Sequence, residues 1–176
     1  MEGRFLLADD VEGLRAQALR AEAQGAGIVV LSEGPLGDPI VLAAGLSPSV
    51  PRVSLGVRLS LSGDGRHPAL LAREVTSLDL VSGGRSVLCF SVPFSERLVE
   101  AIALCRIMWR EGEAHSEGPH FPVQSAVNLP RPAGPQSPLI ALDLTGDEEL
   151  PASLVGEADL LLYPTDDATV CRVERS

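Results

Sequence analysis

The clearest structural signal in the chain is the sequence VSLGVRLSL at residues 53–61. Apolar residues alternate with small or polar ones: one face carries only Val and Leu, and the other carries Ser54, Gly56, Arg58 and Ser60. A period of two is typical of a β-strand, because successive side chains point to opposite faces of the sheet. The sequence therefore predicts a strand with one apolar face and one face that holds polar groups.

The segments on both sides of this strand alternate between strand and helix signals. Asp10, Asp38 and Pro68 stand where a helix N-cap or first helical residue is expected, and Gly83-Gly84 ends the third helical pattern. Repeated strand and helix units imply a parallel sheet with helical crossovers. We expect strands at 4–8, 27–31, 53–61 and 86–92, and helices from 11 to about 24, 39–46, 68–82 and 95–110.

The last third of the chain is less regular. Residues 111–137 hold five Pro and no sustained periodicity, which predicts a long excursion with at most a short hairpin. Strands are expected at 138–142 and 158–163, with a short helix around 148–155 between them. We expect one domain over residues 1–164 and a loosely held polar tail over 165–176.

Composition narrows the class of protein. The chain has 176 residues, a formal net charge of −10, and Arg as its only basic residue apart from His. The Arg residues are scattered singly, so we expect no nucleic-acid partner. The three Cys are far apart, which predicts reduced thiols. The sequence has no signal peptide and no apolar run of about 20 residues, so we expect no membrane partner and a cytoplasmic protein.

The sequence RHPALLAREVTSLDLVSGGR at residues 66–85 closely resembles the bacterial luciferase-like monooxygenase family. Other segments are similar to the family in the same order, and together they cover most of residues 20–163: AEAQGAGIVVLSEG (21–34), DPIVLAAGL (38–46), RVSLGVRLSL (52–61), ERLVEAIALCRIMWREGEAHSEGPHF (96–121), PRP (130–132) and SPLIALDLTG (137–146).

This resemblance implies a (β/α)8 barrel that binds FMN or a deazaflavin at the carboxyl ends of its strands, usually as a dimer. A complete barrel takes about 250 residues, so we expect an incomplete TIM-type barrel, mostly parallel, whose last strands are missing and whose sheet edges are unpaired. In length the chain is similar to the non-fluorescent flavoproteins of luminous bacteria, which are shortened luciferase relatives.

The resemblance also places the cofactor-binding candidates, which are Glu33, Arg58, Ser60, Ser91, Thr145 and Gly146. Two positions depart from the family. Gly34 follows Glu33 where the family has His, and Cys89-Phe90-Ser91 replaces Gly-x-Gly, so that side chains are expected to crowd a flavin ring there. No catalytic residue is assigned. Two alternatives remain open: the chain binds FMN or a deazaflavin, or it has lost cofactor binding.

Each candidate has a plainer reading as well. Arg58 suits a phosphate or carboxylate partner, but an exposed Arg on an open sheet explains it too. His115, Glu117 and His120 form a weak metal pattern in a covering segment, and no metal site is assigned. His67 suits the start of a helix better than catalysis, and Cys89 suits a small buried apolar residue.

Two functions remain from the sequence. The first is a shortened luciferase-like oxidoreductase or monooxygenase that uses a flavin or deazaflavin. The second is a non-catalytic subunit or scaffold. In either case the resemblance implies a homodimer, or a heterodimer with a longer family member, formed through helices 39–46 and 68–82. Whether the chain is an enzyme, and on which substrate, is left open.

Overall fold

Side-chain caps begin the helices where the sequence predicts them. Asp10 Oδ1 accepts a hydrogen bond from Gly13 N at 2.6 Å, and helix α1 (Val11–Ala23) follows. Asp38 Oδ1 accepts from Ile40 N at 2.8 Å at the start of α2 (Pro39–Leu46). Helix α3 (Pro68–Ser82) ends at Gly83, whose φ of 71° is the left-handed conformation that favours glycine. Ser95 caps α4 (Glu96–Glu111). These helices are therefore fixed by local sequence.

The computed structural model describes residues 1–61, 66–91, 95–136, 138–144, 154 and 156–176. The strands are β1 (Glu2–Phe5), β2 (Ile28–Ser32), β3 (Ser54–Leu59), β4 (Ser86–Ser91), β5 (Glu113–Ser116), β6 (Val123–Val127), β7 (Leu139–Asp143), β8 (Leu160–Pro164) and β9 (Val170–Arg175). Strands β1, β2, β3, β4, β7, β8 and β9 form a closed barrel in that order, and β1 to β8 of this set run parallel. The fold is the expected α/β barrel.

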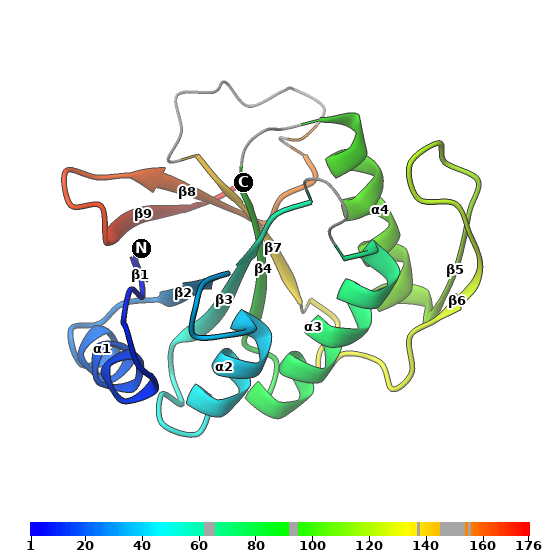
Figure 1. Cartoon of the computed structure of the whole chain (residues 1–176). Helices are drawn as coiled ribbons and strands as arrows, with labels where there is room; N and C mark the ends of the chain where they lie inside the picture. Colours follow the sequence, from blue (N-terminus) through cyan, green and yellow to red (C-terminus); the bar gives the residue numbers. More distant parts are fainter. Residues whose placement is uncertain (62–65, 92–94, 137, 145–153, 155) are drawn as a thin grey trace.

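Alternation along the strands divides the core into two layers. Outward-facing residues such as Leu55, Val57 and Phe90 pack against α1 to α4, which lie along the outside of the barrel (Figure 1). Inward-facing residues fill the barrel itself: Phe5, Ile28, Val30, Val87, Cys89, Ala141, Leu160, Leu162, Cys171 and Val173. The predicted two faces of residues 53–61 are confirmed, because Leu55 and Val57 face the helices and Gly56 lies against the side chains of Val30, Ile28 and Cys89.

The expectation of a loose tail and unpaired sheet edges is wrong. Residues 170–175 form β9, which pairs antiparallel with β8 on one side and with β1 on the other. Cys171 and Val173 point into the barrel, while Arg172 and Glu174 are exposed. The returning strand closes the sheet with seven strands among the described residues, one fewer than a complete (β/α)8 barrel has.

The excursion after α4 contains the short hairpin expected there, β5–β6, which lies beyond α4 (Figure 1). Backbone amides of His120 and Phe121 donate to the Glu100 carboxylate on α4, at 3.0 and 2.7 Å. Asn128 is buried and donates to Thr76 Oγ1 on α3 at 3.0 Å. The excursion is thus fastened to α3 and α4. None of the described helices is long and apolar enough to cross a membrane.

Candidate functional site

A polar layer lies on top of the apolar barrel interior, at the carboxyl ends of the strands. Arg58 is the last inward-facing residue of β3, and its Nε donates to Ser32 Oγ at the end of β2 (2.9 Å). Its Nη1 makes an ion pair of 2.7 Å with Asp143 Oδ2 at the end of β7. Because Arg58 is level with Cys89 in the register, its side chain spans β4 to reach Asp143. We call Ser32, Arg58, Ser91 and Asp143 the polar layer.

Burial makes this ion pair different from the other ion pairs between residues that the structure describes. The Asp143 side chain is 1% exposed, whereas that of Arg58 is 29% exposed. The guanidinium also lies 4.9 Å from the ring centroid of Phe5, which forms part of the barrel filling below it. A buried carboxylate and a cation–π contact therefore fix Arg58, while part of the guanidinium still faces outward.

The rim of the barrel holds two further predicted residues. Glu33 is exposed, and its Oε2 accepts a hydrogen bond of 3.3 Å from the backbone N–H of Ser60. Gly34 begins a tight turn that the Gly37 N–H closes on the Gly34 carbonyl at 3.2 Å. Glu33, Arg58 and Ser60 are thus brought together at the ends of β2 and β3. Thr145 and Gly146 lie outside the described residues, as does most of the helix expected at 148–155.

The side chains of 89–91 do not all face the site. Phe90 is 1% exposed and packs outward with the helix-facing core, so it is directed away from the barrel mouth, and the expected crowding by Phe90 is wrong. Cys89 lies in the interior, one layer below Ser91. Ser91 is level with Asp143 in the register and ends β4 in the polar layer. Strand alternation, which the family comparison does not convey, separates these three positions.

Cys89 is confirmed as a buried apolar residue. Burial raises the pKa of its thiol, and the Asp143 carboxylate raises it further, whereas Arg58 acts in the opposite direction. A thiol held in the protonated form is a poor nucleophile. Cys89 therefore contributes packing to the barrel interior rather than chemistry.

The histidines take structural or exposed positions. His67 Nδ1 accepts from Ala69 N at 3.1 Å, and its ring meets Phe121 edge to face at 5.4 Å, which confirms the helix-start reading. His115 Nε2 lies 3.5 Å from Glu117 Oε1 on the exposed β5 hairpin. His120 is fastened through its backbone. In the part of the chain that the structure describes, no three His, Cys, Asp or Glu side chains are grouped for a metal.

Sequence reasoning missed Ser32 and Asp143. Both are the last residues of their strands, and in a parallel sheet the strand ends meet at one edge. The polar endings of IVVLS and LIALD were therefore available as a signal. The ion pair of Asp143 with Arg58 could not be predicted from these endings, because it depends on the curvature of the barrel, which brings β7 within reach of β3.

Comparisons with known proteins agree with this fold. The family model of the luciferase-like monooxygenases matches residues 3–90, which is half of the chain. The chain belongs to the luciferase-like monooxygenase family. The matched residues run from β1 to β4 and include Glu33, Arg58 and Ser60, whereas Asp143 lies beyond them. The search of curated proteins found no match.

Solved structures of several monooxygenases and of a reductase have the same fold. The coenzyme F420-dependent tetrahydromethanopterin reductase of Methanopyrus kandleri has a TM-score of 0.73 at 18% identity, covering 92% of this chain and 55% of that one. EDTA monooxygenase from Chelativorans sp. BNC1 has a TM-score of 0.69 at 19% identity, with 87% and 48% covered. Monooxygenase RslO1 from Streptomyces bottropensis has a TM-score of 0.64 at 21% identity, with 80% and 52% covered. The chain spans about half the length of these proteins.

Proposed function

We propose that this member of the luciferase-like monooxygenase family is a flavin- or deazaflavin-dependent oxidoreductase whose cofactor ring lies over the polar layer. The observation that carries the proposal is the fixed Arg58 guanidinium at the carboxyl end of a filled barrel. Active sites of TIM-type barrels lie at this end. Solved neighbours include an F420-dependent reductase and a Baeyer-Villiger monooxygenase in complex with FMN.

The charges of the polar layer favour a ring over a phosphate. Asp143 neutralises Arg58, so a phosphate would meet an ion pair of no net charge. The part of the guanidinium that faces outward still carries N–H donors, which suit the carbonyl oxygens of a flavin or deazaflavin ring. Apolar side chains fill the barrel below, so the ring would lie across the mouth.

A bound flavin or deazaflavin supplies hydride transfer, and a reduced flavin supplies reaction with oxygen. The protein's part is positioning and electrostatics. Arg58 is held from two sides before any ligand binds, so its N–H donors would stabilise negative charge on a bound ring without reorganisation. Glu33 and Ser60 hold the neighbouring rim in place through their hydrogen bond.

The test is a titration of the purified protein with FMN and with coenzyme F420, followed by the absorbance and fluorescence of each cofactor. We expect one of them to bind. The double variant Arg58→Met/Asp143→Leu removes the donors without leaving a buried charge, and it should weaken binding by about tenfold or more. Arg52→Met removes an exposed Arg that pairs with Glu22, and this variant should bind the cofactor as the natural chain does. Binding of neither cofactor, or equal binding by the double variant, contradicts the proposal.

Exposed apolar side chains favour a second function, as a subunit or scaffold that dimerises with itself or with a longer family member. Four large apolar residues are exposed on α2 and α3, namely Val41, Leu70, Leu80 and Val81. Exposed apolar groups on neighbouring helices favour association. We expect a dimer in analytical ultracentrifugation or a complex with a co-expressed family member in a pull-down, and Val81→Glu should disrupt it. Val11→Glu, at an exposed apolar residue of α1, is the control. A monomer that captures no family member rules this function out.

A further inference from the structure

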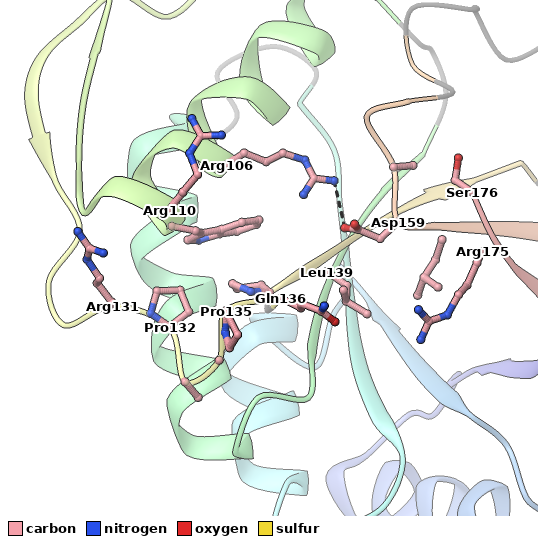
Figure 2. Close-up of a pocket in the computed structure, with 16 residues that line it drawn as sticks. Arg106, Arg110, Arg131, Pro132, Pro135, Gln136, Leu139, Asp159, Arg175 and Ser176 are labelled. Atoms are coloured by element: carbon pink, nitrogen blue, oxygen red, sulfur yellow. Dashed lines mark hydrogen bonds and ion pairs between the residues drawn. The ribbon is translucent and has the colours of Figure 1, made fainter.

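A cavity lies at the opposite end of the barrel from the polar layer. It is bounded by the C-terminal half of α4, by residues 131–136 and 138, by the amino ends of β7 and β8, and by the end of β9, and its volume is about 860 Å³. Figure 2 shows the side chains that surround it. Because parallel strands run away from this end, the cavity is separated from the mouth by the full depth of the filled interior. It belongs to no part of the site proposed above.

The cavity concentrates positive charge in an acidic protein. Among the described residues that line it, four are Arg and one, Asp159, has an acidic side chain, in a chain with a net charge of −10. Arg106 and Arg110 come from successive turns of α4, Arg131 from the excursion and Arg175 from β9. The fold therefore gathers cations that are scattered in the sequence, and the one visible hint was the helical spacing of Arg106 and Arg110.

Existing contacts leave much of this charge uncompensated. Arg106 pairs with Asp159 at 3.1 Å, and Figure 2 marks this contact. Arg110 pairs with the neighbouring exposed Glu111 at 2.8 Å, and Arg131 Nη2 donates to the Glu111 carbonyl at 2.6 Å. Among the described residues, no carboxylate lies within ion-pair distance of Arg175. Exposed pairs of this kind are weak, so the cavity can receive an anion.

Much of the remaining wall is apolar and includes the only Trp of the chain, beside the polar Gln136 and Ser176. Trp109 is nearly buried and is fixed by its Nε1–H, which donates to the Ala72 carbonyl at 3.0 Å. Leu139, Leu160 and several Pro line the same space. A volume of this size and a mixture of apolar wall with a few polar groups are typical of sites for small organic ligands.

We propose that this cavity binds a small organic phosphate, a phosphomonoester that carries a flat apolar group. Guanidinium groups match the oxygens of a phosphate with paired N–H donors, and a doubly charged oxyanion gains more from several cations than a neutral ligand does. The apolar group would lie against the wall formed by Trp109, Leu139 and the Pro residues. The site would be distinct from the cofactor position over the polar layer.

The experiment uses the fluorescence of Trp109, which lines the cavity and is the only Trp of the chain. The probes are phenyl phosphate, inorganic phosphate and phenol. We expect phenyl phosphate to change the fluorescence saturably, the other two to bind about tenfold more weakly or not at all, and high salt to weaken binding. No saturable change with phenyl phosphate overturns the proposal. Equal affinity for inorganic phosphate overturns the assignment of an organic ligand, and equal affinity for phenol overturns the role of charge.

Variants locate the binding. Arg110→Gln/Arg175→Gln removes two cations that make no buried contact and should weaken phenyl phosphate binding about tenfold or more. Arg52→Gln/Arg172→Gln removes two exposed Arg that do not line the cavity and should leave binding unchanged. The ¹⁵N–¹H resonance of the Trp109 indole confirms that each variant is folded and gives a second measure of binding. Unchanged affinity in the first variant, or equal loss in both, contradicts the proposal. Neither measurement depends on FMN or F420.

Discussion

At the scale of single residues, removing Arg58 alone should cost more stability than removing Arg58 and Asp143 together. Asp143 is almost fully buried, so Arg58→Met removes a counter-charge from a carboxylate that water barely reaches. We expect a loss of about 3 kcal/mol in the free energy of unfolding by urea. Arg58→Met/Asp143→Leu should recover most of it, since neither charge remains. The exposed Arg52→Met should cost less than about 1 kcal/mol. A double variant as unstable as Arg58→Met would contradict this account.

The three thiols make a second residue-scale prediction, which concerns pH. Burial raises the pKa of Cys105 to about 12 and, with a further contribution from Asp143, that of Cys171 to about 11, and Cys89 is raised as well. In the unfolded chain these thiols ionise near pH 9. Above that pH the folded form therefore binds more protons than the unfolded chain does. The stability that the protonated thiols contribute is fully present below about pH 9 and is lost as pH rises towards 11.

Urea unfolding under reducing conditions at pH 8 and pH 10 checks this prediction. In Cys105→Ala the fall should be smaller, because one group that must stay protonated is gone. At pH 8 the native protein should react slowly with iodoacetamide and the unfolded protein fast, since all three Cys are buried. Stability that rises between pH 8 and pH 10 would show that the sign is wrong.

At the scale of elements, two glycines should respond in opposite directions to the same change. In β1, a Cβ on Gly3 would lie 2.7 Å from Cys171 Sγ and 2.7 Å from Ile28 Cγ2, so Gly3→Ala must push β9 or β2 away. In α2, a Cβ on Gly45 meets nothing within 4 Å. We expect Gly3→Ala to destabilise by about 1–3 kcal/mol and Gly45→Ala to stabilise by up to about 1 kcal/mol. Thermal unfolding at low protein concentration measures both, and shifts of the same sign would contradict the packing at Gly3.

Local signals explain which elements were predictable. The caps at Asp10, Asp38 and His67 act within three residues, so sequence alone located three helix starts. Strand β9 was missed although Cys171 and Val173 alternate with Arg172 and Glu174, because charged residues made the segment look like a tail. Its turn is also local: Thr169 donates to Asp167 Oδ1 from both its N–H and its hydroxyl. What sequence could not supply was the partner, β1, at the other end of the chain.

At the scale of the whole molecule, both sites depend on closure of the barrel. The polar layer needs β7 within reach of β3, and the cavity needs the end of β9 beside α4. Arg58 was identified because alternation placed it on the inward face. Asp143 was not grouped with it by any spacing, and among the four cavity Arg only Arg106 and Arg110 share a helical spacing. Long-range contacts of this kind follow from topology, which composition and periodicity specify only in outline.

Closure itself can be tested through β9. Val173 is buried in the barrel between β1 and β8, so Val173→Asp places a carboxylate among apolar side chains. We expect β9 to separate from β1 and β8. Hydrogen exchange of the β9 amides should then rise well above that of the β3 amides. One of these amides is the Val173 N–H, which donates to the Met1 carbonyl at 2.8 Å. An opened edge also invites association, so the variant should elute as larger species in size exclusion. Glu174→Asp puts the same side chain on the outward face and should change neither result. If the β3 and β9 amides lose their protection from hydrogen exchange equally, the seven strands open as one unit, and the prediction that β9 opens on its own is wrong.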